Sequence, residues 1–368
     1  MKRLSQTGLA ILVVLALTGS KRTFAQIEEI GNMLAGGKED AKVLLQPYIA
    51  PAVNAFGAAL SGGWYNTAEP HKLGGFDITF TASAAFIPKQ DKTFLIDNND
   101  LQFLKLSEGQ SVEAQSIGGQ KIPGPQMVYN IQDGSGNVVY TQPAFRMPEG
   151  LNASWVPAPM IQAGIGLIKG TDVMFRYLPN IKYTGNEVGL WGIGGRHDIK
   201  QWIPGVKRIP VFKMSLMYGY TKMHTFVSMS IDKSTIGASG LNDGPNTPAT
   251  WEDQYMKLWV RSQTANLLLA ADLKVVTFYG GVGFVTTKTN LKLEGDFPMV
   301  QFSQTDLEPQ VIAMTDPLEM EITNQDGGIT KPRFNAGVRF KLAIVTIHFD
   351  YSWANYSVLT GGLGFSFR

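Results

Sequence analysis

The chain has no cysteine among its 368 residues. This excludes a disulfide scaffold, a thiolate metal site and a lipid anchor on an N-terminal cysteine. Charge is also scarce, because charged residues make up 17% of the chain and the formal net charge is +2. A nucleic-acid-binding domain would be strongly basic. Beyond the first 25 residues no stretch approaches about 18 uninterrupted apolar residues, and the mean hydropathy of −0.02 argues against a helical membrane protein.

The start of the chain is predicted to be a secretory signal peptide, residues 1–25. Two basic residues open it, and residues 9–17 form an apolar core too short to span a membrane. Cleavage is expected after Ser20 or Ala25, and the small residues before the second position favour Gln26 as the mature N-terminus. The protein is therefore expected to be exported. If it resides in a membrane, it must do so as a barrel.

The clearest pattern lies at the other end of the chain, in residues 333–368. Apolar side chains alternate with polar or small ones in three runs, which start near Phe334, Val345 and Leu359. Period 2 places each set on one face of a strand, and a soluble sandwich would give the same alternation. The opposite face carries Arg339, Lys341, His348 and Asp350. Together with the aromatic, glycine-rich end, these polar side chains favour the closing strands of a transmembrane barrel, apolar outside and polar inside.

The same alternation recurs from Leu73 onward. It predicts an all-β fold, a single antiparallel transmembrane β-barrel of about 12–14 strands over residues 73–368. Tracing back from a periplasmic C-terminus gives about 12 strands, and hairpins hidden in irregular regions would make about 14. The periplasmic turns are expected near residues 169–171, 271–272 and 341–342. The long segments 232–252 and 288–332 are expected to be extracellular loops.

Glycine and aromatic residues are plentiful, with 40 glycines and 11% aromatics. This composition fits an all-β protein with one lipid-facing surface. Several aromatic residues lie near expected strand ends or turns, where barrels carry a girdle at the membrane interface. The residues assigned to this girdle are Trp64, Tyr65, Tyr177, Tyr218, Tyr220, Trp353 and Tyr356.

The segment before the barrel, residues 26–72, is expected to be helical and then glycine-rich. Glu39 and Asp40 suit a helix start, where carboxylates interact well with the helix dipole. Pro47 and Pro51 should kink or split this helix. Two interpretations stay open: a plug that enters or lies beneath the barrel, or a loosely ordered periplasmic segment.

Candidate functional residues follow from the face on which each side chain lies. The predicted pore-lining or ligand-binding set is Asp77, Asp172, Arg176, Lys213, Arg339, His348 and Asp350. Glycine lets a plug approach the wall closely, and polar plug atoms need partners in the lumen. The predicted plug contacts are therefore Gly62, Gly63, Tyr65 and Asn66.

His348 and Asp350 form the one pair that suggests catalysis, because they lie two apart on one strand face. Polar packing of the lumen, or a salt link with Arg339, accounts for them better. The four histidines show no metal-ligand spacing, and neither a P-loop nor a nucleophile elbow is present. We therefore expect no enzyme, no cofactor and no metal.

A short motif, Tyr65-Asn66-Thr67-Ala68, follows a glycine- and alanine-rich stretch and precedes the long first strand. This order resembles the start of FadL-like proteins, the long-chain fatty acid and toluene transport barrels. Their motif is aromatic-Asn-Pro-Ala, and Thr67 replaces the proline here. The end of the chain is similar to those of an uncharacterised group of Gram-negative outer-membrane barrels. The resemblance implies a 14-stranded barrel, an N-terminal hatch, and hydrophobic substrates that leave through a lateral opening.

Three function classes remain. The first is an outer-membrane channel or transporter for small hydrophobic molecules. The second is a structural or assembly-partner barrel that uses its long loops as contact surfaces. The third is a membrane-embedded enzyme, which depends on His348 and Asp350 alone. The expected partners are outer-membrane lipid and a small hydrophobic substrate, without nucleic acid, and the oligomeric state is left open.

Overall fold

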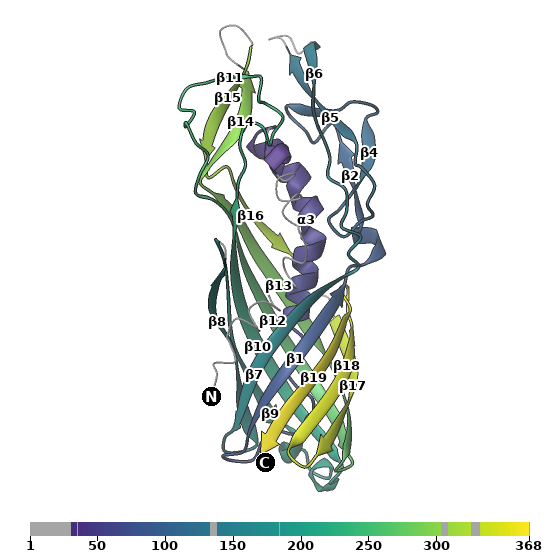
Figure 1. Cartoon of the computed structure of the whole chain (residues 1–368). Helices are drawn as coiled ribbons and strands as arrows, with labels where there is room; N and C mark the ends of the chain where they lie inside the picture. Colours follow the sequence, from purple (N-terminus) through teal and green to yellow (C-terminus); the bar gives the residue numbers. More distant parts are fainter. Residues whose placement is uncertain are drawn as a thin grey trace.

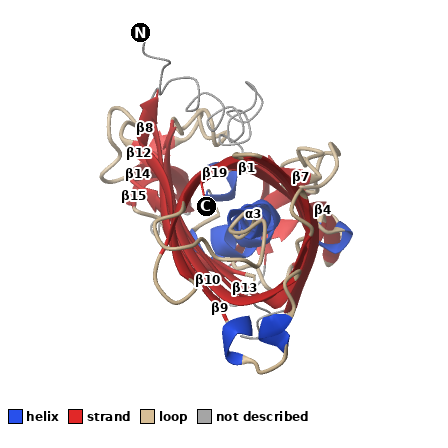
Figure 2. Cartoon of the chain, turned by 90° about the horizontal axis from the view of Figure 1, so that it is seen from below, coloured by secondary structure: helices blue, strands red, loops and turns tan. Residues whose placement is uncertain are grey.

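The computed structural model describes residues 31–34, 36–132, 138–183, 185–302, 308–324 and 332–367. The predicted signal peptide and the predicted mature N-terminus at Gln26 lie outside these residues. Within them, ten antiparallel strands close into a barrel (Figures 1 and 2). The order around the ring is β1, β7, β8, β9, β10, β12, β13, β17, β18, β19 and back to β1.

Each barrel strand alternates between the lumen and the outer surface, as period 2 requires. On β1, for example, Phe80 is exposed, whereas Thr79 and Thr81 are buried. The exposed apolar side chains form the band that a transmembrane barrel presents to lipid. The bounds are β1 (Phe76–Phe86), β7 (Trp155–Gly166), β8 (Thr171–Tyr183), β9 (Asn186–Asp198), β10 (Phe212–Met229), β12 (Gln254–Asp272), β13 (Val276–Glu294), β17 (Pro332–Leu342), β18 (Val345–Trp353) and β19 (Val358–Phe367).

The predicted all-β barrel is confirmed, but its ring has ten strands where the sequence predicted about 12–14. The other strands form small sheets of their own. These are β2 (Thr93–Asp97) with β4 (Ser111–Gln115); β3 (Leu104–Leu106) with β5 (Gln126–Gln132) and β6 (Val138–Arg146); and β11 (Asn242–Asp243) with β15 (Pro309–Thr315) and β14 (Asp296–Phe302). Alternation shows that a segment is a strand but not which sheet it joins, and this explains the error in the count.

The two ends of the barrel differ. At one end, called the turn end, short turns join β7 to β8, β12 to β13 and β17 to β18, and the described chain finishes there (Figure 1). A connector with two short 3-10 helices, Lys200–Trp202 and Val206–Arg208, joins β9 to β10. At the other end, the loop end, long excursions follow β1, β10 and β13. The turns lie where the sequence predicted them.

The excursions build a tower above the loop end, made of the described residues of 87–154, 230–253 and 295–324 with the upper parts of β10, β12 and β13 (Figure 1). The predicted loop 288–332 is wrong in its first part, because β13 continues to Glu294. There it pairs with β16 (Leu318–Thr323), and β14 and β15 follow in the same excursion. This excursion is therefore built largely from strands.

One helix, α3 (Lys38–Leu60), runs from the tower into the barrel and appears at the centre of the ring in Figure 2. Asp40 in its first turn is fully buried and accepts hydrogen bonds from the backbone N–H groups of residues 102–104. Leu44 and its neighbours pack in an apolar cluster with the tower, and the last residues of α3 pack inside the barrel wall. An 18-residue window of the helix has a mean hydropathy of 1.3, and the helix is long enough to cross a membrane, but burial within the protein accounts for that composition.

Pro47 and Pro51 lie inside α3, which continues through both. The expected split is therefore wrong, and the tower and the barrel wall pack around the helix on several sides. Ile117 of the tower also donates its backbone N–H to the Tyr48 carbonyl at 2.9 Å. The described part of this segment enters the barrel from the loop end and lies inside it, as the plug interpretation expects.

Candidate functional site

After α3 ends, residues 61–75 cross the rest of the lumen without regular secondary structure and lead into β1 at the turn end. We call this segment the hatch. Most of it is buried, including Trp64, Tyr65, Ala68 and His71. An extended segment leaves its backbone N–H and C=O groups free, and buried groups of this kind need partners. The side chains of the barrel wall therefore have to supply them.

Arg176 of β8 holds the upper part of the hatch. Its guanidinium carbon lies 3.7 Å from the centroid of the Trp64 ring, a cation–π contact. The same guanidinium donates to the carbonyls of Leu60 and Gly62 at 2.8 and 2.6 Å. Gln162 accepts from Arg176 Nε at 3.0 Å and donates to the Trp64 carbonyl at 3.1 Å. The planar fork of arginine thus fixes the end of α3 and the start of the hatch together.

Two wall glycines make room for the Trp64 ring. A Cβ built on Gly194 of β9 would lie 2.7 Å from the indole, and one built on Gly219 of β10 would lie 2.5 Å from it. Real Cβ atoms do not approach other heavy atoms so closely. The indole is therefore held between a glycine surface on the wall and the guanidinium of Arg176.

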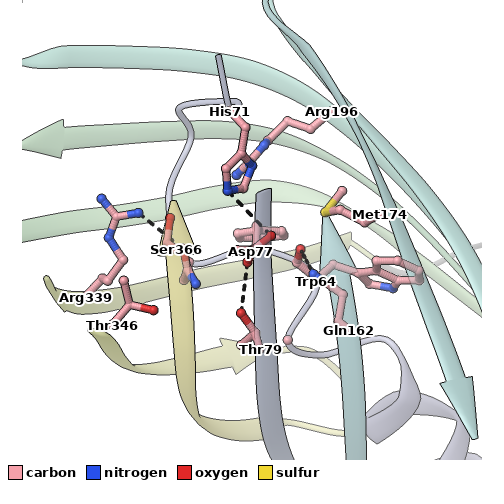
Figure 3. Close-up of a pocket in the computed structure, with 13 residues that line it drawn as sticks. Trp64, His71, Asp77, Thr79, Gln162, Met174, Arg196, Arg339, Thr346 and Ser366 are labelled. Atoms are coloured by element: carbon pink, nitrogen blue, oxygen red, sulfur yellow. Dashed lines mark hydrogen bonds and ion pairs between the residues drawn. The ribbon is translucent and has the colours of Figure 1, made fainter. Parts of the chain in front are cut away.

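Nearer the turn end, Asp172 of β8 anchors the hatch. Its carboxylate accepts from the His71 backbone N–H at 3.1 Å, and His71 Nδ1 lies 3.1 Å from the same oxygen. Arg196 of β9 pairs with Asp172 and donates to the Thr67 carbonyl at 2.5 Å. His71 Nε2 lies 3.5 Å from Asp77 of β1, and Figure 3 shows these side chains converging. Because Asp172 and Arg196 are both buried, each compensates the loss of water by the other.

The opposite wall also bonds to the hatch. Tyr65 donates its hydroxyl to Asn335 of β17 at 2.7 Å. Arg339 of the same strand donates to Asn66 at 3.4 Å and to Thr277 of β13 at 2.9 Å. The motif that resembles FadL-like proteins is therefore bonded to both walls of the lumen.

The candidate catalytic pair is not assembled. His348 and Asp350 are both buried on the inner face of β18, but Asp350 accepts from the Tyr279 hydroxyl at 3.1 Å. Among the described residues, neither ring nitrogen of His348 has a hydrogen-bond partner. The alternative salt link is also not seen, because the acid near Arg339 is Asp272, at 3.8 Å. That the chain is no enzyme stays an expectation.

The structure places all the predicted luminal residues on the inner face of the barrel. Lys213 of β10, near the turn end, pairs with Glu69 of the hatch at 2.7 Å. In the hatch itself, Gly63 has a φ of +68°, which favours glycine, and lies against Thr81 of the wall. Whether any of these residues contacts a transported ligand stays a prediction.

Three of the girdle assignments, Trp64, Tyr65 and Tyr356, are wrong. Trp64 is 1% exposed and lies in the lumen, not in a membrane girdle. Tyr356 is buried and bonds to Asp91 of the tower. Tyr65 belongs to the hatch, as its second assignment said. Tyr177, Tyr218 and Trp353 are exposed on the outer surface, as a girdle requires.

Sequence reasoning missed several residues that hold the hatch. They are His71, Gln162, Arg196 and Arg333, the last of which donates to the Ser61 carbonyl at 3.3 Å. A usable signal existed for Arg196 and Arg333. Each has the strand parity of an inward side chain, and a charge facing the lumen of a barrel needs a partner. No local signal identifies His71, whose partner Asp172 is 101 positions away.

The hatch leaves little free space in the lumen. A cavity lined by Trp64, His71 and Asp77, drawn in Figure 3, has a volume of about 10 Å³. A second, beside Ser61 and Arg333, has about 20 Å³. Volumes of about 10–15 Å³ hold a single water molecule. In the part of the chain that the structure describes, neither of these cavities forms a passage.

The barrel wall, in contrast, has a gap. β7 and β8 pair only near the turn end, from Gln162↔Arg176 to Gly166↔Asp172. Beyond that point β7 remains paired with β1, and β8 remains paired with β9 as far as Tyr183, apart from a register shift between Leu178 and Ile181. The two strands therefore part toward the loop end, and β8 is seen apart from β7 in Figure 1.

Prolines line both edges of this gap. Ile87 donates its N–H to the Ser154 carbonyl at 2.9 Å. In an antiparallel ladder, backbone groups of successive residues point to opposite neighbours. Even-numbered residues of β7 therefore face β1, and Pro157 and Pro159 occupy positions that face β8. Pro179 of β8 lies at the register shift, where no pair with β9 is formed. Proline has no N–H, so each removes a donor that the gap would leave unpaired.

Apolar side chains lie on the inner side of the gap. Ala158 and Met160 of β7 belong to one buried cluster with the end of α3, and Leu178 and Ile181 of β8 pack against it. An apolar molecule that entered between the strands would therefore meet apolar side chains and the helix.

The fold and the lumen define a class of protein: a β-barrel of the transmembrane type that is closed by its own N-terminal segment. The chain belongs to a family of unknown function (DUF6588), whose sequence pattern it matches over residues 1–367. No curated protein matches it.

Three solved structures are similar to the chain at low scores. Ail, the attachment invasion locus protein of Yersinia pestis, is 8% identical with a TM-score of 0.25, covering 80% of this chain and 98% of that one. The translocator domain of autotransporter NalP from Neisseria meningitidis is 10% identical with a TM-score of 0.29, covering 91% and 99%. A deltaS2 mutant of the monoaromatic hydrocarbon channel TodX is 8% identical with a TM-score of 0.22, covering 81% and 91%. At these scores none of them indicates which molecules this chain binds or transports.

Proposed function

We propose that the protein is an outer-membrane transporter of small hydrophobic molecules, which pass between the lipid and the lumen through the gap between β7 and β8. The gap carries this proposal. Its edges lack the N–H groups of Pro157, Pro159 and Pro179, and its inner side is apolar. The turn end would face the periplasm and the tower the outside, as is usual for bacterial barrels. The resemblance of the hatch motif to FadL-like transporters supports the same function.

Transport requires the hatch to move, because it closes the lumen. The apolar cluster behind the gap would receive the hydrophobic molecule first. Passage toward the turn end would then require Arg176 to release the carbonyls of Leu60 and Gly62. We propose that this contact is the gate between the apolar upper lumen and the polar lower lumen.

The test is to close the gap covalently. Because the chain has no native cysteine, Pro159→Cys of β7 and Tyr177→Cys of β8 place two unique thiols on either side of the gap, beyond the last β7–β8 pair. A bismaleimide that joins them should slow uptake of radiolabelled toluene and of a long-chain fatty acid to the rate of cells that lack the protein. Uptake should return when a cleavable version of the linker is cut.

The matched control joins the same two strands where they already pair. Ala163→Cys and Phe175→Cys are register partners with exposed side chains, so their cross-link should leave uptake unchanged. If the linked gap transports as fast as the unlinked one, the lateral route is wrong. If neither variant nor the parent increases uptake over cells without the protein, the transporter function is wrong.

A second candidate is a structural or assembly-partner barrel without transport. The observation that favours it is the packed lumen, whose interior cavities of about 10 and 20 Å³ hold at most a water or two. This candidate predicts no uptake by the parent protein and the co-purification of a partner in fixed stoichiometry, bound through the tower.

A further inference from the structure

Three cations lie side by side on the outer surface of the barrel. Lys222 of β10 is the register partner of Arg261 of β12, and Arg261 is the register partner of Lys288 of β13. All three have the outward parity of their strands, and Arg261 and Lys288 are exposed. We call these three residues the basic row.

The basic row is not neutralised by the protein. Like charges directly opposite each other on neighbouring strands destabilise a sheet. Lys288 lies 3.1 Å from Glu321 of β16, but that pair is about half exposed and contributes little. Within the described residues, neither Lys222 nor Arg261 has an acidic partner within 4.0 Å, and Arg261 reaches only the amide oxygen of Asn290, at 3.5 Å. An external anion would remove this repulsion.

The row stands where each strand leaves the apolar band. Along β10, the exposed Leu216 and Tyr218 precede Lys222, and along β13 the exposed Val282 and Phe284 precede Lys288. Trp191 of β9, the register partner of Lys222, packs against Tyr220 with ring centroids 5.5 Å apart. Cations and amphipathic aromatic rings directly beyond an apolar surface are typical of a lipid headgroup interface.

The other side of the barrel has no such row. At the loop end of β1, β7, β17, β18 and β19, the outward side chains are apolar or aromatic: Phe86, Trp155, Phe334, Trp353 and Leu359. A general interface girdle would place cations around the whole circumference. The basic row is instead limited to three adjacent strands, and the further lysines at this end, Lys182, Lys257 and Lys292, are each paired with an acidic residue.

We propose that the basic row binds the phosphate groups of a lipid in the outer leaflet, a phosphorylated glycolipid of the lipopolysaccharide type, whose acyl chains lie along the apolar side chains below the row. This inference rests on the membrane orientation given above, because the row must face the outer leaflet. It does not depend on transport. The apolar band beneath the cations distinguishes a lipid from a free anion, which would use the cations alone.

The experiment compares two charge-matched triple variants of the purified full-length protein in detergent. One is Lys222→Gln, Arg261→Gln, Lys288→Gln. The control is Lys207→Gln, Arg208→Gln, Lys274→Gln, which removes the same number of lysines and arginines from exposed positions at the turn end. Native mass spectrometry measures binding of bis-phosphorylated lipid A, of lipid A with its phosphates removed, and of inorganic phosphate. A mobility shift on heating confirms that each variant remains a folded barrel.

The parent and the control should bind phosphorylated lipid A equally, and the basic-row variant should bind it on the order of 100-fold more weakly, at about 1 kcal/mol for each cation near an anionic surface. Equal binding by both triple variants, or equal binding of lipid A without phosphates, would overturn the proposal. Binding of inorganic phosphate as tight as that of lipid A would overturn the lipid part of it. Loss of lipid binding with normal uptake, or the reverse, would separate this site from the transport function.

Discussion

In the upper part of the molecule a helix fills the space with apolar side chains, and in the lower part an extended hatch fills the lumen through polar contacts. The helix satisfies most of its backbone groups internally, so the wall around it can be apolar. The hatch cannot, so the wall around it supplies Arg176, Arg196, Arg333 and Asp172. The secondary structure of the plug therefore decides the polarity of the wall that faces it.

A single strand shows this change. The inward side chains of β8 near the turn end include Asp172 and Arg176, which bond to the hatch. Farther along the same strand, beyond the point where β7 departs, Leu178 and Ile181 pack against the apolar cluster around α3. The change from polar to apolar coincides with the end of the β7–β8 ladder. A lateral gap is compatible with an apolar lumen at this level, whereas beside the charged hatch it would expose buried ion pairs to lipid.

The comparison predicts an all-or-none difference in accessibility between the two ends of the plugged lumen. Lys42 is exposed on α3 in the tower, and Lys207 is exposed in the turn-end connector. In intact cells a membrane-impermeant maleimide should label Lys42→Cys fully and Lys207→Cys only after permeabilisation, against a background of no native cysteine. The opposite pattern would show that the helix enters from the periplasm.

In the lower half of the lumen, removing a side-chain charge should lower the stability of the protein even when the side-chain volume is unchanged. Asp172→Asn is nearly isosteric but leaves Arg196 buried without its ionic partner, and a broken buried pair costs about 3–5 kcal/mol. Urea unfolding in lipid vesicles measures this loss. As a control, Asp243→Asn removes an ion pair with Lys233 in which the aspartate is 60% exposed, and the expected cost is about 0–1 kcal/mol. A small effect of Asp172→Asn would mean that water already reaches the lower lumen.

In the upper half, reducing the volume of an apolar side chain should lower the stability of the protein even when the side chain stays apolar. Leu44 of α3 is fully buried in the apolar cluster with the tower. Leu44→Ala should destabilise the protein by about 3 kcal/mol, whereas the volume-conserving Leu44→Met should cost less than about 1.5 kcal/mol. Hydrogen exchange should localise the effect of Leu44→Ala to α3 and the tower. Equal loosening of the hatch would contradict the division of the plug into two independent parts.

The same division explains how far the sequence could predict the structure. Strand parity is a local property, so alternation placed Arg339, His348 and Asp350 on the inner face. The partner of a luminal side chain is not local, and neither is the sheet that a strand joins. Trp64 illustrates the limit: an aromatic residue before the first strand suits a girdle and a plug equally well, and only the Arg176 contact from β8 decides between them. In the sequence the gap is marked by Pro157, Pro159 and Pro179. These prolines can be interpreted only once it is known which strands pair with β7 and β8.

The smallest expected effect concerns the fit between the hatch and the wall. Gly219→Ala would place a Cβ 2.5 Å from the Trp64 indole, and the displaced ring would press against Arg176. Overpacking of this kind costs about 1–3 kcal/mol. Gly195→Ala, whose Cβ would meet nothing nearer than 3.8 Å, is the matched control one strand away and should be neutral. Because the added methyl strains the contact proposed as the gate, Gly219→Ala should also increase ion conductance in planar bilayers. If conductance rises equally in both variants, or in neither, the Trp64 contact does not hold the hatch closed.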